Sequence, residues 1–165
     1  SEMCIRDSQN GEDVPLLATY IQQSLQPVGI RVEIVNLDIA GALAAVYRDW
    51  NFDMATGWHQ YRGDPAVSTT VWYRSGSPKG APWTNQWGWK SEKIDELTDR
   101  AAAELDPAKR KALYAEWTKE INEALPIWMI TEREFQTAAS KRVRNGMNYP
   151  RWGSGDWHDT WLAAG

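Results

Sequence analysis

Cysteine, long apolar runs and clustered basic residues are scarce in this sequence, and each shortage excludes a class of protein. Cys4 is the only cysteine, so neither a disulfide framework nor a thiolate metal site forms within the chain. The longest strongly apolar run, Ile39 to Tyr47, is far too short to span a bilayer. The 18 basic residues form no stripe and the net charge is −4, which excludes a nucleic-acid partner.

The chain has the composition of a folded domain, with 165 residues of which 42% are hydrophobic and 24% are charged. These values are typical of one globular domain or a large piece of one. Tryptophan is in surplus, with 11 residues against 2 phenylalanines. Flat indole rings indicate ligand walls or a carbohydrate-type surface, or they are packed core residues.

The first eight residues, SEMCIRDS, show no periodicity and resemble read-through of a sequencing adapter. We therefore interpret residues 1–8 as a non-native leader and expect them, with Cys4, to lie outside the fold. On this interpretation the true N-terminus lies upstream, so the absence of a signal peptide carries no information about destination.

The next segments predict a strand, a helix and a second strand behind a first helix. That first helix runs from about Val14 to Gln26, with Asp13 as its cap. Strands are expected at Ile30–Asn36 and Phe52–Trp58, joined by a helix from Asp38 to Asp49. This order predicts neighbouring parallel strands in a right-handed βαβ unit, and hence an α/β fold with a mixed sheet flanked by helices.

The rest of the chain predicts a helical hairpin between two irregular regions. The expected elements are a short helix at Ala66–Tyr73, a long ordered loop at Ser75–Trp89, helices at Ser91–Leu105 and Asp106–Ala124, and strands at Pro126–Thr131 and Glu134–Ser140. We expect residues 9–140 to form the α/β lobe and residues 141–165, rich in glycine and tryptophan, to form a return segment. The ending has little to pack against, which is typical of a fragment.

Polar and aromatic side chains gather where the second predicted strand ends. They are Trp58, His59, Gln60, Tyr61 and Arg62, in the stretch FDMATGWHQYRGDP. In open α/β sheets, ligands bind in the crevice at the carboxyl ends of the strands. We therefore predict that these five residues bind a ligand by stacking and hydrogen bonding. The alternative is an ordinary surface loop whose tryptophan covers a core edge.

Other chemistry has weak support in the sequence. Asp64 and Pro65 have the arrangement of a helix cap followed by a first helical residue, which indicates an architectural role. His59 and Asp64 invite an acid–base interpretation, but no paired metal-ligand or catalytic spacing is present. We expect no metal and no cofactor.

Several motifs in fixed order resemble one protein family. They are LLATYIQQSLQPVGIRVEIVNLD, FDMATGWHQYRGDP, KSEKIDELTDRAAAELDPAKRKALYAEWTKEINEALPIWMI and KRVRNG, which together cover roughly Val14 to Gly146. The order resembles the C-terminal part of the extracellular solute-binding proteins (family 5) that serve peptide and nickel ABC importers. The tail from Trp152 to Leu162 matches more loosely.

The resemblance implies a two-lobed receptor of the type II periplasmic binding protein class, of which this chain is most of one lobe. It implies a protein that is not an enzyme, works with an ABC permease, requires its missing N-terminal part, and is periplasmic or lipid-anchored outside the cytoplasmic membrane. In this family Trp58 would line the pocket. Peptide-binding relatives commonly have, at the position of Tyr61, an Asp that meets the amino group of the peptide. The resemblance therefore implies a small polar solute, but Tyr61 disfavours a free peptide amine, so an opine-like or sugar-like solute is an alternative to a peptide.

Two other function classes remain open on the sequence alone. A tryptophan-rich carbohydrate-binding module of a hydrolase would have a β-sandwich fold, which the two long helices between Ser91 and Ala124 disfavour. An enzyme using His59 and Asp64 is the third possibility, and the lack of paired acid–base spacing makes it the weakest.

Overall fold

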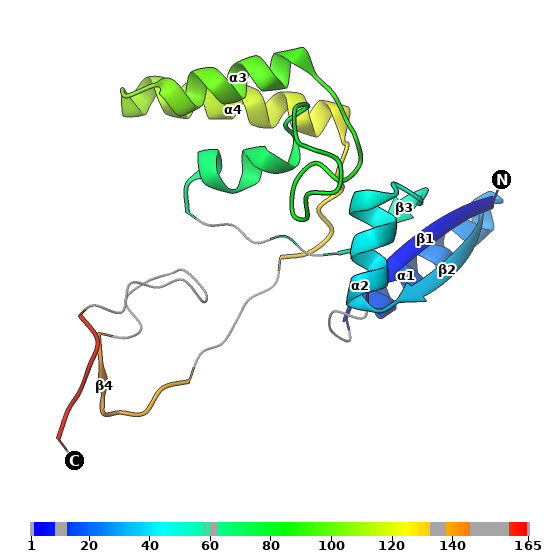
Figure 1. The fold of residues 1–165 in the computed structure, drawn as a ribbon, viewed down its shortest axis with the longest axis horizontal. Helices are drawn as coiled ribbons and strands as arrows, with labels where there is room; N and C mark the ends of the chain where they lie inside the picture. The colour runs from blue at the N-terminus through cyan, green and yellow to red at the C-terminus, as the bar shows by residue number, and fades with distance from the viewer. Residues whose placement is uncertain are drawn as a thin grey trace. The chain divides into compact units, whose positions relative to one another are not determined.

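The described chain forms two compact units. The computed structural model describes residues 2–8, 13–57, 59, 63–132, 138–145 and 159–164 (Figure 1). The N-terminal unit comprises residues 1–126 and the C-terminal unit comprises residues 127–165. Among the described residues, no helix is both long enough and apolar enough to cross a membrane.

A three-stranded parallel sheet is the base of the N-terminal unit. Its strands are β1 (Glu2–Ser8), β2 (Arg31–Leu37) and β3 (Met54–Ala55), in the order β2-β1-β3. Ile5 in β1 pairs with a residue of each neighbouring strand and is 0% exposed. The expectation that residues 1–8 lie outside the fold is therefore wrong, because they form the central strand.

Helix α1 (Asp13–Leu25) forms because its apolar side chains recur at helical spacing. Val14, Ala18 and Ile21 are buried, and the last two share a core cluster with residues of β1 and β2. A 3₁₀ turn follows the helix, and Gly29 ends it with a φ of 80°, a left-handed conformation that glycine adopts without strain. The predicted first helix is confirmed.

Helix α2 (Ile39–Leu43) begins at Asp38, whose carboxylate accepts a hydrogen bond of 2.6 Å from the Gly41 N–H. The helix continues as a π-helical turn at Ala44–Arg48, which buries Val46 and Tyr47. The predicted second helix is confirmed, but its hydrogen-bond pattern widens after Leu43.

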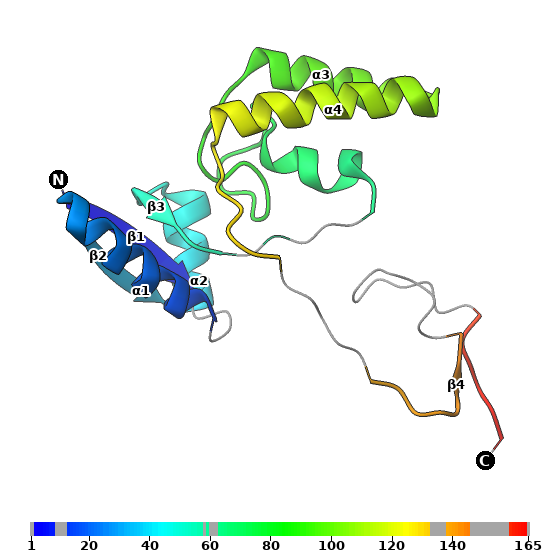
Figure 2. The same cartoon turned by 180° about the vertical axis from the view of Figure 1, so that it is seen from behind.

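The sheet topology corrects one prediction. Strands β2 and β3 run in the same direction, as predicted, but they are not neighbours because β1 lies between them. The connection from β1 to β2 and the connection from β2 to β3 therefore run in opposite directions across the sheet. If both crossover connections are right-handed, their helices must lie on opposite faces. Figures 1 and 2 show α1 and α2 on opposite faces of the sheet.

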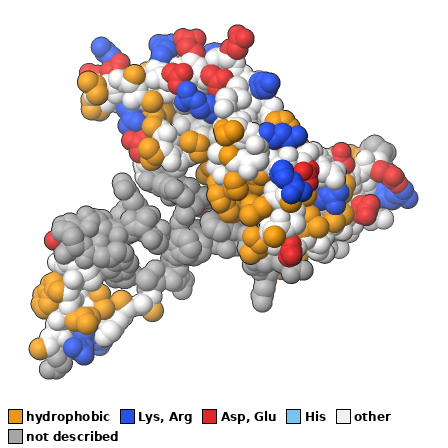
Figure 3. All heavy atoms as spheres, in the orientation of Figure 1, with side chains coloured by type: hydrophobic (Ala, Val, Ile, Leu, Met, Phe, Trp, Pro, Cys, Tyr) orange, Lys and Arg blue, Asp and Glu red, His pale blue; other side chains and the backbone are white. Residues whose placement is uncertain are grey.

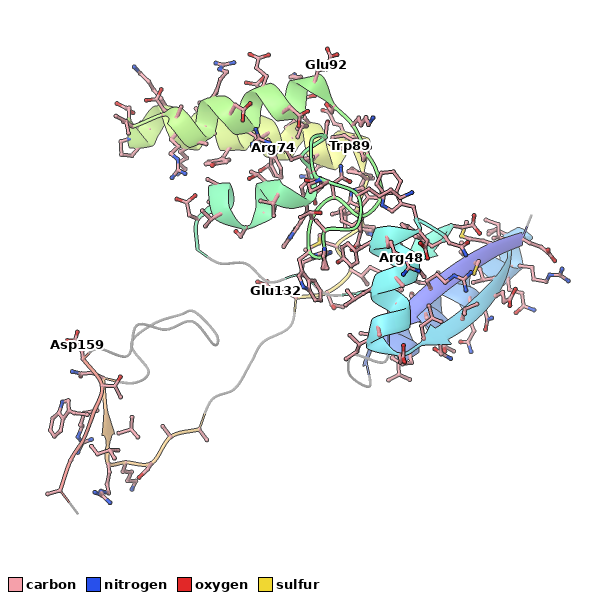
Figure 4. The ribbon with its side chains drawn as sticks, in the orientation of Figure 1. Arg48, Arg74, Trp89, Glu92, Glu132 and Asp159 are labelled. Atoms are coloured by element: carbon pink, nitrogen blue, oxygen red, sulfur yellow. The ribbon has the colours of Figure 1, made fainter. Side chains whose placement is uncertain are left out.

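A long loop joins the sheet to the helical hairpin. After Asp64 the chain makes two 3₁₀ turns, at Pro65–Val67 and Thr69–Trp72, and then no helix or strand until α3. The Asn85 amide donates to the carbonyl oxygens of Arg74 and Trp89, at 3.2 and 2.6 Å, and so closes the loop on itself. Figure 4 shows Arg74 and Trp89 beside the hairpin. The predicted ordered loop is confirmed.

The hairpin consists of α3 (Glu92–Ala103) and α4 (Pro107–Ala124). The side chains of Ser91 and Asp106 cap the two helices, as the sequence predicts. Between the helices, the Trp117 indole N–H donates to the buried Thr98 hydroxyl at 3.0 Å. Figure 3 shows charged side chains across the outer surface of the hairpin, where Lys93 pairs with Glu120.

Among the described residues of the C-terminal unit there is one short antiparallel pair, β4 (Val143–Arg144) with β5 (Trp161–Leu162). The predicted strand at Pro126–Thr131 is wrong, because these described residues form no strand. Trp128 and Met129 there are 73% and 64% exposed, so the apolar run has no neighbouring ladder to join. Most of the other predicted strand, Glu134–Ser140, lies outside the described residues.

Candidate functional site

A small pocket lies at the carboxyl ends of β1 and β3. Arg6 near the end of β1 lines it, together with Ala55, Thr56 and Gly57 at and after the end of β3, and His59 beyond them. The Arg6 Nε donates to the Asn51 carbonyl oxygen at 3.0 Å, which fixes the arginine beside the pocket. This is the edge of the sheet at which α/β proteins bind ligands.

Helix α2 and its π-helical turn supply the apolar wall of the pocket. The residues are Ile39, Ala42, Leu43, Val46 and Tyr47. Burial is the main cause that raises the pKa of the Tyr47 hydroxyl above its usual value, so the group stays neutral.

The long loop supplies the third wall through Trp83 and Gln86. Trp83 lies against Tyr47, with ring centroids 6.0 Å apart, and the Gly80 N–H donates to the Tyr47 carbonyl oxygen at 2.9 Å. The pocket volume is about 50 Å³. Because ligand sites for drug-sized molecules span roughly 300–1,000 Å³, this pocket holds one group of a ligand rather than a whole molecule.

His59 is the predicted site residue whose environment the structure describes. Its ring packs on Trp72, with centroids 4.2 Å apart, and meets Trp87 edge-on at 6.0 Å. Burial lowers the pKa of His59 to about 4, so the imidazole is neutral at physiological pH. A neutral ring packed on indoles contributes a hydrogen-bonding nitrogen and shape, and no charge.

Asp64 has an architectural environment. Its carboxylate accepts the Ala66 N–H at 2.9 Å and pairs with the Arg110 guanidinium at 2.8 Å. Both hydrogen bonds lower the pKa of Asp64, and the bond from Arg110 has the larger effect. The carboxylate is engaged by both partners, which argues against a role in proton transfer with His59.

The tryptophan surplus serves packing as well as the pocket. Tyr73 is the centre of an aromatic cluster in which Trp87, Trp89 and Trp117 approach its ring to between 5.0 and 6.4 Å. Burial raises the pKa of Tyr73 to about 12. The cluster secures the long loop to the hairpin.

Solved structures share this architecture. DppA from Helicobacter pylori, in complex with the peptide STSA, is 26% identical to the chain with a TM-score of 0.65, over 76% of this chain and 24% of that chain. AppA from Bacillus subtilis, in complex with a nonapeptide, is 19% identical with a TM-score of 0.62, over 76% and 24% of the two chains. NikZ from Campylobacter jejuni, in complex with Ni(L-His), is 17% identical with a TM-score of 0.62, over 74% and 24%.

The chain carries part of the fold of a family 5 solute-binding protein. It spans about a quarter of the length of the solved chains that it matches. Neither a scan of protein-family models nor a search of curated proteins gives a match. The fold is that of type II periplasmic binding proteins, so the β-sandwich expected of a carbohydrate-binding module is overturned.

Most of the predicted ligand-binding residues of this solute-binding fold lie outside the described residues. They are Trp58, Gln60, Tyr61 and Arg62. His59 lies at the pocket, while Asp64 and Pro65 form the start of the following 3₁₀ turn. Within the described residues, no group of three or more His, Cys, Asp or Glu side chains is placed to hold a metal ion.

Sequence patterns identify only one of the residues that line the pocket, His59. Trp83 and Gln86 lie in the long loop, whose length is typical of a functional loop, but no motif marks them individually. Tyr47 has the spacing of a core residue, and Arg6 belongs to the segment interpreted as a leader. Their places depend on contacts between distant segments, which local patterns do not encode.

Proposed function

We propose that this chain is part of the solute-binding component of an ABC importer, and that it captures a peptide-like or other small polar solute for delivery to a membrane permease. One observation carries the proposal. The pocket lies at the carboxyl edge of a parallel sheet, in a fold shared with proteins solved with a peptide or with Ni(L-His). The full-length protein would act outside the cytoplasmic membrane, free in a periplasm or anchored by a lipid.

Binding in this proposal involves no chemical step. The walls of the pocket are apolar on the α2 side and polar at Arg6, Gln86 and His59, which suits a solute that presents both kinds of surface. The absent part of the protein would supply the opposite wall, and closure of the two parts would exclude water. The proposed contact residues are Trp58, His59, Gln60, Tyr61 and Arg62.

The test is calorimetric titration of the full-length protein with peptides, Ni(L-His) and sugars. We expect one class to bind, and we expect Trp58→Ala and Tyr61→Ala each to weaken that binding about tenfold or more, as loss of an aromatic wall does. Unchanged affinity in both variants would reject the loop after β3 as the site. Conversion of any solute to a product would reject the proposal of a binding protein without enzymatic activity.

A further inference from the structure

Strand β2 forms one edge of the sheet, since no described strand lies on its far side. The direction of the backbone groups in the central strand shows which groups of β2 are free. The Cys4 carbonyl oxygen accepts a hydrogen bond of 3.3 Å from the Asp53 N–H, and so faces the side of β3. Backbone groups alternate in direction along a strand, so Met3 and Ile5 turn theirs towards β2.

The outward-facing residues of β2 follow from its register with β1. Met3 lies opposite Val32, and Ile5 lies opposite Ile34. In a parallel ladder, a residue bonds to the two residues that flank its partner, and the partner directs its own groups away. Val32 and Ile34 therefore present their N–H and C=O groups at the free edge, where another strand can pair with them.

One of these outward groups is already capped by a side chain of α1. The Gln22 amide donates to the Val32 carbonyl oxygen at 2.7 Å. It therefore occupies the position that an N–H donor of an added strand would take. An open groove of about 460 Å³ lies at this place, between the last turns of α1 and the start of β2. In other proteins, exposed sheet edges bind extended segments by strand addition.

The charges of β2 favour a second copy of the same strand as the occupant. Arg31 and Glu33 are exposed on either side of Val32, whose own side chain is buried in the core. In an antiparallel pair with Val32 opposite Val32, Arg31 of each copy lies opposite Glu33 of the other. Two pairs of opposite charge then form across the interface. Arg31 already pairs with Glu2 of β1, so it would lie between two carboxylates.

The alternative antiparallel register lacks this charge complementarity. With Ile34 opposite Ile34, Glu33 would lie opposite Val35 and Arg31 opposite Leu37. Each charge would then meet an apolar side chain. The register centred on Val32 is therefore the favoured one.

We propose that the free edge of β2 is a self-association surface that takes β2 of a second copy in antiparallel register, with Val32 opposite Val32. Gln22 limits this association because it caps the Val32 carbonyl oxygen. The interface is two-fold, so both copies use the same edge. The inference goes beyond the proposed function and does not rest on it, since none of these residues lines the pocket at the carboxyl ends of the strands.

The experiment is sedimentation velocity of the chain over a concentration series. Gln22→Ala removes the cap and keeps a good helix former, so its dimer dissociation constant should be about tenfold or more below that of the wild type. Gln23→Ala is the matched control, because it makes the same change at an exposed residue of the same groove and should associate like the wild type. Equal association of Gln22→Ala and the wild type, or no dimer of either, overturns the inference.

A charge exchange in the Gln22→Ala protein tests the register. Glu33→Arg places two arginines opposite each other at both ends of the pair and should weaken the dimer about tenfold. Adding Arg31→Glu restores opposite charges and should bring the dissociation constant back to within about threefold. A dimer that is insensitive to Glu33→Arg, or not restored by the second change, overturns this interface.

Circular dichroism establishes that each variant is folded. If Gln22→Ala fails to fold, Gln22→Glu takes its place in both experiments, because an ionised carboxylate has a similar size and no donor. The same increase in association is expected of it, and association equal to that of the wild type overturns the inference.

Discussion

The carboxylate of Asp64 and the guanidinium of Arg110 form two hydrogen bonds, of 2.8 and 3.1 Å. Arg110 also donates Nε to the Ala101 carbonyl oxygen at 2.9 Å, near the end of α3. Asp64 begins the 3₁₀ turn that follows the proposed site loop. This one ion pair therefore fixes the far end of that loop to the helical hairpin.

Replacing Arg110 should loosen that attachment. Arg110→Gln removes the cation and the two-point geometry, and Arg110→Lys restores only a point charge, so both should lower the thermal unfolding midpoint, with glutamine lower than lysine. Circular dichroism melts measure the difference. Arg74→Gln is a matched control, because Arg74 makes a single hydrogen bond to Asp99 on the surface, and its effect should be smaller. Equal midpoints for Arg110→Gln and the wild type would contradict this role.

The ion pair of Asp64 and Arg110 should also account for part of the loss of stability at acidic pH. Arg110 and the Ala66 N–H lower the folded-state pKa of Asp64 below its ordinary value of 3.8. The stabilisation is therefore complete above about pH 4 and is lost as pH falls through the lowered pKa. Melting curves from neutral pH to pH 2.5 (roughly) should show a shallower decline for Asp64→Asn than for the wild type. Parallel curves for the two proteins would show that the pair does not contribute.

His59 predicts a second pH dependence, in a higher range. Its pKa of about 4 in the folded state lies below the ordinary 6.5, so the unfolded chain binds a proton that the folded chain does not. Stability should therefore fall as pH drops from about 6.5 to about 4, by at most roughly 3 kcal/mol, and then level off. Denaturant titrations of the wild type and His59→Phe measure this. A slope of the same size in both proteins would contradict the assignment.

Gly88 occupies a position at which the structure leaves no room for a side chain. Its φ is +62°, and a β-carbon there would lie 2.7 Å from the Trp50 ring. Gly88→Ala should destabilise the protein by about 1–3 kcal/mol, since it adds a clash to a left-handed backbone. Gly76→Ala is the control, because a β-carbon at Gly76 meets nothing within 4 Å.

Gly88→Ala introduced into the Trp50→Ala variant should destabilise the protein less than it does in the wild type. The clash with the indole ring is then gone, and only the backbone strain remains. Chemical denaturation of the four proteins gives the comparison. An equal cost in both backgrounds would place the penalty in the backbone alone.

Helices were predictable from the sequence because their determinants are local. Asp38, Ser91 and Asp106 cap the helices they precede, and the apolar spacing of α1 gave its buried face. The parallel direction of β2 and β3 followed from the helix between them. Each of these features depends on residues within one or two turns of each other.

Strand β1 was not predictable, because its determinants are distant. Its sequence has no alternation, and its place comes from backbone hydrogen bonds to β2 and β3 and from the burial of Ile5. The prediction that β2 and β3 are neighbours is wrong for the same reason, because it does not include the central strand. The predicted strand at residues 126–131 had the right composition but lacks a paired neighbour.

The position of the pocket was predictable from the sequence, but most of the residues that line it were not. The rule that ligands bind at the carboxyl ends of parallel strands indicated the edge where the pocket lies. Trp83 and Gln86 reach that edge only because the long loop folds back, closed by Asn85 and held by Tyr73 and its tryptophans. No spacing in the sequence encodes that path.

Hydrogen exchange of the full-length protein with and without a bound solute locates the solute contact without any substitution. We expect slower exchange of the amides in residues 52–64 and 80–88, with unchanged exchange in the outer turns of α3 and α4. Protection confined to the helical hairpin, or no protection in either segment at saturating solute, would contradict it.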